Sequence, residues 1–344
     1  MNIKRILCAS MAGAMLLLGG CNNANNNVIG NNNSDQNTDD QVQAKKVTFA
    51  LDWTPNTNHT GIYVAKALGY YDEVGIDLEI VQPEESSTEA LVAAGRAQFG
   101  VGFQDTIAAS YTSDTPMPVT SIAAIINHNT SGIISRADKG IDSFAKLEGH
   151  TYATWDSPVE QNVIKAAMEA DGGDFDKVEL VSTYVTDVMA ALQTDMIDSV
   201  WVFEGWDVAK ARVDGFDYNY IDFAKTNPVL DYYSPTIITS DALIESDPEL
   251  VRSFLAATKK GYEYCVENPS DAARILCEAV PELDKALIEE SMEFLATAYV
   301  GDGEFGWGYI DEGRWTAFYD WLYENGLIEK ELGSFGFTNE FLPQ

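Results

Sequence analysis

Short apolar runs alternate with helical patterns along most of this 344-residue chain. The first apolar run, residues 47–51, leads through a polar turn into a helical pattern that ends at Gly69. Further strand-type runs follow at 77–81, 98–102 and 119–126, with helical patterns at 88–95 and 104–111 between them. This alternation predicts an α/β fold in which a parallel sheet carries helices on both faces.

A second strand–helix cycle occupies the middle of the chain. Its first long helix, 159–169, is expected to be capped by Ser157 with Pro158 at the first helical position. From Thr236 the chain returns to one more strand and then to long helices at 248–267, 270–279, 284–299 and 311–325. We therefore expect two lobes joined by a double crossover. Residues 45–135 and 236–344 would form lobe 1, and residues 136–235 lobe 2.

The first 21 residues have the pattern of a secretory signal. Lys4 and Arg5 precede an apolar stretch, 6–18, that is too short to span a bilayer. Residues 18–21 resemble the lipobox of bacterial lipoproteins, which implies that Cys21 is lipidated; cleavage of an ordinary signal elsewhere is the alternative. The Asn-rich residues 22–44 have the composition of a disordered tether. This predicts a lipid-anchored protein on the extracytoplasmic face of the cell membrane.

The formal net charge of −33 excludes a nucleic-acid backbone as a partner. The acidity indicates either a cationic ligand or simply a solvated acidic surface.

Cys265 and Cys277 are the two thiols outside the first 21 residues. We favour two buried free thiols over a disulfide, although the extracellular setting permits a disulfide. Cys and His at the usual zinc spacings are missing, so we expect neither a metal nor another cofactor.

The turn after the first apolar run is the strongest candidate for a ligand site. It places Asp52, Trp53, Asn56 and His59 between the carboxyl end of a strand and the amino end of a helix. Ligands of α/β proteins bind at such positions. Tyr63, one helical turn further on, is expected to pack in the core.

Several segments resemble the type II periplasmic-binding-protein superfamily. Within it, residues 51–78 are similar to the first strand, turn and helix of the NMT1/THI5-like branch, which unites ThiY-type thiamine-precursor-binding lipoproteins with fungal enzymes that make the thiamine pyrimidine. Further matches to the branch lie at 95–100, 192–204 and 337–342, whereas 247–255 matches only the superfamily. The similarity covers about 46–342. It implies two lobes, each a mixed sheet flanked by helices, that close on a small molecule and dock on the permease of an ABC importer.

The resemblance also implies an aminopyrimidine ligand, such as formylaminopyrimidine or hydroxymethylpyrimidine. Flat rings of this kind stack on aromatic side chains, and their amines form strong hydrogen bonds with carboxylates. We therefore expect Trp53 to stack on the ring. Asp52 and Glu204, one at a strand end in each lobe, would clamp the ligand from opposite sides; the alternative is that both only cap helices.

Other candidate ligand residues lie in the second lobe and at the return crossover. Trp155, Ser157 and Glu160 surround the amino end of a helix. Tyr232 and Tyr233 stand at the crossover and could cover the cleft. Asn56 and His59 either donate hydrogen bonds to the ligand or only hold the turn. Trp307, between two glycines, is expected in the core. Apart from Trp307, the residues named as candidates are expected to bind the ligand, and none is expected to be catalytic.

The fungal enzymes of the branch carry a Lys and a His after the third strand and a Cys cluster near the return crossover. Here Gly102 and Thr106 stand at the corresponding positions, and residues 230–235 contain no Cys. The three His form no triad pattern with a Ser. We therefore expect a monomeric binding protein with a permease partner rather than an enzyme. Riboflavin or another small heterocycle is the alternative ligand.

Overall fold

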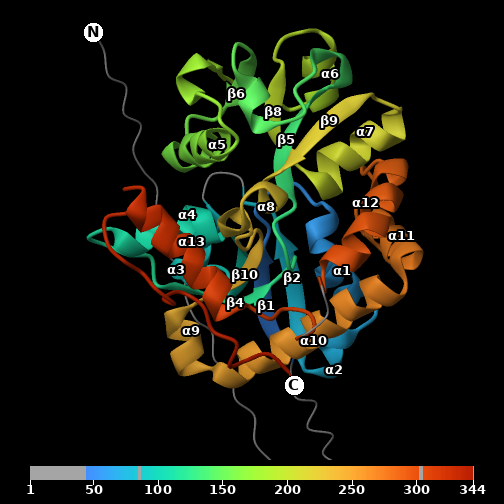
Figure 1. The fold of residues 1–344 in the computed structure, drawn as a ribbon. Coiled ribbons are helices and arrows are strands. Elements are labelled where there is room, and N and C mark those ends of the chain that lie inside the picture. The colour runs from blue at the N-terminus through green and yellow to red at the C-terminus, as the bar shows by residue number, and fades with distance from the viewer. Residues whose placement is uncertain (1–43, 84–86, 302–304, 344) are drawn as a thin grey trace, which may run out of the picture. The chain divides into compact units, whose positions relative to one another are not determined.

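Two five-stranded mixed sheets form the framework of the computed structural model, which describes residues 44–83, 87–301 and 305–343 (Figure 1). The strand order is β2-β1-β3-β10-β4 in the first sheet and β7-β6-β8-β5-β9 in the second. The two-lobed α/β architecture expected from the sequence is therefore confirmed. Both sheets belong to one compact unit of the chain. The expected signal and Cys21, and nearly all of the expected tether, lie outside the described residues.

The first sheet contains β1 (Lys45–Ala50), β2 (Ile76–Val81), β3 (Phe99–Gly102), β4 (Val119–Ala124) and β10 (Thr236–Ser240). Strands β1 to β4 share one direction, as the alternating pattern predicted, but β10 is inserted antiparallel between β3 and β4. The sheet is therefore mixed, as the family resemblance implied, and the local alternation predicted only its parallel strands. The strand that breaks it comes from the returning chain, whose Ile237 and Ile238 are buried on opposite faces of the sheet.

The second sheet contains β5 (Ser131–Arg136), β6 (Thr151–Thr154), β7 (Glu179–Ser182), β8 (Ser199–Phe203) and β9 (Tyr218–Asp222). Strand β5 pairs antiparallel with both β8 and β9. Nearly all of β5 precedes residue 136, where the second lobe was expected to begin. It belongs to the second lobe because Ile133 and Ile134 are buried in the two hydrophobic clusters on either side of this sheet.

Helices cover both sheets (Figure 1). Those of the first lobe are α1 (Thr60–Ala67), α2 (Tyr70–Glu73), α3 (Thr88–Ala93), α4 (Gln104–Thr112), α9 (Asp241–Ser246), α10 (Pro248–Glu267), α11 (Pro269–Ala279), α12 (Lys285–Ala298) and α13 (Glu312–Glu324). The second lobe carries α5 (Pro158–Ala170), α6 (Val188–Gln193), α7 (Ala209–Asp214) and α8 (Phe223–Thr226). Helix α12 contacts α10 and α11 as well as α7 and therefore links the lobes. No helix within the described residues has the length and apolar character needed to cross a bilayer.

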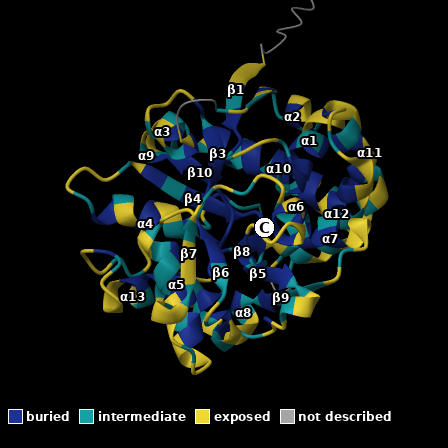
Figure 2. Cartoon of the chain, turned by 90° about the horizontal axis from the view of Figure 1, so that it is seen from above, coloured by how far each residue is buried: buried dark blue, intermediate teal, exposed yellow. Residues whose placement is uncertain are grey.

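Buried residues lie mainly on the strands in the middle of the molecule, and exposed residues lie mainly at its periphery (Figure 2). In the first lobe Phe254 of α10 stacks on Phe99 of β3 at 3.8 Å between ring centroids. Trp307 is buried and stacks on Tyr262, so its predicted place in the core is confirmed. Tyr63 is half-buried and packs against the same cluster. Cys265 and Cys277 are both free thiols.

Candidate functional site

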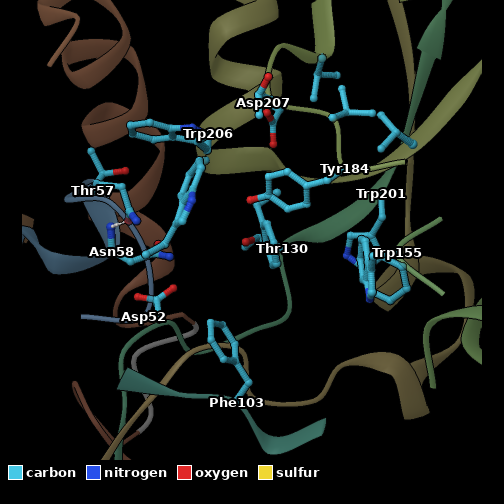
Figure 3. Close-up of a pocket in the computed structure, with 18 of the residues that line it drawn as sticks. Asp52, Thr57, Asn58, Phe103, Thr130, Trp155, Tyr184, Trp201, Trp206 and Asp207 are labelled. Carbon is cyan, nitrogen blue, oxygen red and sulfur yellow. Dashed lines mark hydrogen bonds between the residues drawn. The ribbon is translucent and has the colours of Figure 1, made fainter. Parts of the chain in front are cut away.

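A cavity of about 300 Å³ lies between residues of the two lobes (Figure 3). The first lobe contributes the turn after β1, the residue after β3 and one residue each from the crossover and α12: Asp52, Trp53, Asn56, Thr57, Asn58, Phe103, Ile126 and Leu295. The second lobe and its connection contribute Thr130, Ala153, Trp155, Thr183, Tyr184, Val185, Thr186, Val188, Val200, Trp201, Phe203, Gly205, Trp206 and Asp207. The walls are largely aromatic and aliphatic, with a few polar groups.

The turn after β1 holds Asp52 through a buried imidazole. The Nδ1 atom of His59 accepts a hydrogen bond from the Asn56 backbone N–H at 3.2 Å, so its proton lies on Nε2. Nε2 then donates to Oδ1 of Asp52 at 2.7 Å. His59 is fully buried and does not line the cavity. Of the two alternatives considered for His59, these contacts favour holding the turn, and through it the orientation of Asp52.

Asn56 shapes the same turn. Its side-chain oxygen accepts from the Asn58 N–H at 2.9 Å, and its amide nitrogen donates to the Thr54 carbonyl at 3.0 Å. Asn56 lines the cavity, but both ends of its amide are already hydrogen-bonded within the turn. Its structural role, one of the two alternatives considered, is therefore the one that these contacts favour.

Two pairs of tryptophans face the cavity. Trp53 is 44% exposed and packs edge-on against Trp206 with 6.3 Å between ring centroids. Trp155 is 50% exposed and packs against Trp201 at 5.6 Å. Figure 3 shows Trp206 on one side of the cavity and Trp155 with Trp201 on the other. Large exposed indoles are costly in water, so these faces are suitable platforms for a flat ligand.

The loop after β6 presents Trp155. Asp156 adopts a positive φ of 61° and its N–H donates to Thr154 Oγ1 at 3.0 Å. Ser182 of β7 donates to the Asp156 carboxylate at 2.9 Å. Asp is among the few residue types that tolerate this left-handed conformation. The indole of Trp155 is thereby held outward from the end of the strand.

A second carboxylate of the cavity belongs to Asp207. Strand β8 ends in a π-helical turn, η5 (Glu204–Val208), and Asp207 lies near Tyr184 in the cavity (Figure 3). Burial raises the pKa of the Asp207 carboxyl from 3.8 to about 6. Glu204, which was expected to oppose Asp52, does not line the cavity, and its carboxylate accepts a hydrogen bond from Arg212 at 2.7 Å. The π-helical turn therefore places the acid at position 207, rather than the one at 204, at the cavity.

The chain matches the family model described as NMT1/THI5 like over residues 56–272. It belongs to the NMT1/THI5-like family. Two relatives cover most of the chain. The formylaminopyrimidine-binding protein of Halalkalibacterium halodurans is 29% identical over 85% of this chain and 89% of its own length. The 4-amino-5-hydroxymethyl-2-methylpyrimidine phosphate synthase of Legionella pneumophila is 29% identical over 87% and 92%.

Solved structures show the same fold. The alkanesulfonate-binding protein SsuA from Xanthomonas axonopodis pv. citri superposes with a TM-score of 0.64 at 11% sequence identity. The match covers 85% of this chain and 98% of that one. At this identity the likeness establishes the two-lobed periplasmic-binding-protein fold and nothing about the ligand.

Two further candidates of this NMT1/THI5-like chain lie away from the cavity at the start of α5. Ser157 caps the helix by accepting from the Glu160 N–H at 3.4 Å. Glu160 is buried and accepts hydrogen bonds from Tyr152 at 2.6 Å and Thr154 at 2.8 Å. Burial raises the pKa of Glu160 despite these bonds. Both residues hold the loop that carries Trp155, which corrects the expectation of direct ligand contacts.

Tyr232 and Tyr233 are buried in the core instead of covering the cleft. Tyr232 stacks on Phe318 of α13 with ring centroids 4.1 Å apart. The Tyr233 hydroxyl accepts from the Asp311 N–H at 2.7 Å. Both rings belong to a hydrophobic cluster of lobe 1 and are therefore directed into that lobe.

The sequence prediction missed Asp207, Trp201, Trp206 and Tyr184. The sequence places Trp206 and Asp207 directly after a predicted strand. Which way each side chain points depends on the π-helical turn, which the sequence pattern does not reveal. Tyr184 is 71% exposed, in a short loop between β7 and α6 that has no pattern of its own. Of the described lining residues, two are carboxylates and none is Lys, Arg or His. Within the described residues no group of three His, Cys, Asp or Glu could hold a metal ion.

Proposed function

We propose that this protein is the extracytoplasmic substrate-binding component of an ABC importer and captures an aminopyrimidine of the thiamine-precursor type between its lobes. The observation that carries this proposal is the joint presence of the Asp52 carboxylate and the exposed Trp53 indole at the cavity wall. An aminopyrimidine needs both groups, a carboxylate acceptor for its amine and an aromatic face for its ring. The name of the relative from Halalkalibacterium halodurans supports the same ligand class.

The contacts of Asp52 favour a ligand that donates hydrogen bonds. His59 already donates to Oδ1 of Asp52, which leaves the other carboxylate oxygen to accept from a ligand. The ring of a bound aminopyrimidine would lie on Trp53 with its exocyclic amine directed at Asp52. Such a charge-assisted bond is roughly twice as strong as one between neutral groups.

The lining favours binding over synthesis of a phosphorylated product. A phosphate ester would require cationic or clustered N–H donors, and the described lining residues include no Lys or Arg. Gly102 and Thr106 stand where the fungal enzymes carry their Lys and His. These features support a protein that holds a molecule for delivery without changing it.

A thermal-shift panel on residues 45–344 tests the ligand class. We expect hydroxymethylpyrimidine or formylaminopyrimidine to raise the melting temperature progressively as the ligand concentration exceeds the dissociation constant, because a ligand that binds only the folded state stabilises it. Taurine and alkanesulfonates should produce no shift, since the cavity has two carboxylates and no cation. A shift with taurine alone, or with riboflavin alone, would contradict the proposal.

We further propose that a lipid on Cys21 anchors the protein to the membrane, so that residues 22–44 tether the binding unit near the permease. The support is the lipobox-like sequence that ends at Cys21. The full chain with Cys21→Ser, expressed in a bacterial host, should move from the membrane fraction to the soluble fraction and stop incorporating labelled palmitate. Wild-type distribution and labelling in the variant would refute the anchor.

A further inference from the structure

The cavity has a second aromatic wall, formed by Trp155, Trp201 and Tyr184. Figure 3 shows Trp155 and Trp201 across the cavity from Trp206, and Tyr184 extends from their side into the space between. Trp53 packs against Trp206, so a ligand ring stacked on Trp53 would lie on the Trp206 side of the cavity, opposite Trp155 and Trp201. Two of the three residues of the second wall are strongly exposed. A single ring on Trp53 therefore leaves a second set of aromatic faces without a partner.

The cavity holds a second carboxylate beside Tyr184 of the second aromatic wall. In Figure 3 Asp207 lies between Trp206 and Tyr184, and it lines the same cavity. Arg212 of α7 is engaged by Glu204 at 2.7 Å, and the described lining residues include no cation. Asp207 accepts hydrogen bonds from backbone N–H groups of the turn, but its charge is not neutralised. An uncompensated carboxylate in a poorly hydrated place costs free energy, and a bound cation would offset that cost.

Aromatic faces and a carboxylate together recognise a cation whose charge is spread over a ring or a quaternary nitrogen. Such a cation keeps little of its hydration shell and is attracted by the electron-rich faces of Trp and Tyr. A cavity of about 300 Å³ is at the lower end of the range of pocket volumes for drug-sized molecules. The net charge of −33 also favours the approach of cationic ligands over anionic ones.

We propose that the cavity accepts an aminopyrimidine that carries a second, positively charged ring. The aminopyrimidine would bind at Asp52 and Trp53, and the charged ring would lie against the second aromatic wall beside Asp207. This inference rests on the proposed function and extends it from one-ring pyrimidines to ring-extended cationic ones.

Calorimetric titration with three probes tests the inference. The probes are thiamine, which links an aminopyrimidine to a cationic thiazolium, a neutral analogue with phenyl in place of thiazolium, and hydroxymethylpyrimidine. We expect thiamine to bind wild-type protein about tenfold more tightly than the neutral analogue. Asp207→Asn should lower the affinity for thiamine about tenfold and change the affinity for hydroxymethylpyrimidine by less than about twofold. Asp105→Asn, which removes another buried acid outside the cavity lining, is the matched control and should change the affinity for neither ligand.

The outcomes separate the inference from the function on which it rests. Equal affinity of wild-type protein for thiamine and the neutral analogue would overturn the cationic subsite. An equal loss of affinity for thiamine and for hydroxymethylpyrimidine in Asp207→Asn would overturn it as well. If wild-type protein binds hydroxymethylpyrimidine but not thiamine, the inference fails while the proposed function stands. If it binds none of the three probes, both fail. Trp155→Leu provides a second variant, which should weaken thiamine more than hydroxymethylpyrimidine.

Discussion

Asp52 is oriented by a histidine that never reaches the cavity. The imidazole of His59 is fixed at Nδ1 by the Asn56 N–H, which leaves Nε2 as the donor to Asp52. One carboxylate oxygen of Asp52 is thereby hydrogen-bonded to a residue outside the cavity lining, whereas Asp52 itself lines the cavity. We infer that His59 is a positioning residue whose effect on a ligand passes entirely through Asp52.

Replacing His59 tests this relation. His59→Leu removes a hydrogen bond to a charged group, so aminopyrimidine affinity should fall by about tenfold or more. His59→Gln keeps a donor near the Nε2 position and should retain most of the affinity. Calorimetry measures both, and circular dichroism confirms that each variant is folded. Leu and Gln variants with the same affinity would show that His59 does not position Asp52.

Asp207 makes stability depend on pH. Burial raises the pKa of its carboxyl from 3.8 to about 6, so between these values the folded protein holds a proton that the unfolded chain releases. Asp207 therefore lowers stability progressively as pH rises from about 4 to about 6, and the full cost remains above pH 6. Asp105, whose pKa is also raised to about 6 by burial, lies outside the cavity lining.

Asp207→Asn should accordingly stabilise the unliganded protein at pH 8. We expect a rise in melting temperature of roughly 2–4 °C, the size that corresponds to about 1 kcal/mol in a domain of this class. The gain should fade as the pH falls from 6 to 4. Asp105→Asn should show the same pH dependence without changing ligand affinity. A gain that is independent of pH would contradict the assignment.

Helices α1 and α10 set the position of the whole turn that carries Asp52. Gly61 and Gly261 meet where the helices cross, and a methyl group at Gly261 would overlap the carbonyl oxygen of Gly61. Tyr262 of α10 donates to the Asn58 carbonyl at 2.7 Å. The close approach of the two helices therefore brings the amino end of α1 to its place at the cavity.

Gly261→Ala should destabilise the protein by about 2 kcal/mol or more, because the overlap is with backbone that cannot rotate away. Gly313→Ala is the matched control: this glycine is exposed in the first turn of α13, and alanine there should be neutral or stabilising by up to about 1 kcal/mol. Urea denaturation measures both. Similar stability of the two variants would show that the helices can separate without cost.

The sequence pattern predicted most helices and strands. It did not predict how the returning strand pairs in the sheet, or which side chains at the ends of strands line the cavity. Alternating apolar runs identified β1 to β4 and the opening turn, because these depend on local periodicity and on a polar cluster between two regular elements. The insertion of β10 depends on contacts between residues more than a hundred positions apart, which no local pattern contains. Likewise Glu204 and Asp207 are both acids after β8, and only the π-helical turn decides which one lines the cavity.

The two lobes are joined by two neighbouring crossover segments, 125–130 and 230–235. Asn129 of the first segment donates through its amide to the Leu230 carbonyl at 2.7 Å and through its backbone N–H to Asp231 at 2.8 Å. Helix α12 of the first lobe contacts α7 of the second. A connection of two short segments is suited to closure around a ligand, and the cavity lies between the lobes.

Calorimetric titration of formylaminopyrimidine into residues 45–344 tests the central claim most directly. We predict saturable binding of one ligand per chain in wild-type protein, a loss of about tenfold or more in Asp52→Asn, and unchanged affinity in Glu204→Gln. The absence of binding to wild-type protein, or equal affinity of wild type and Asp52→Asn, would contradict the account.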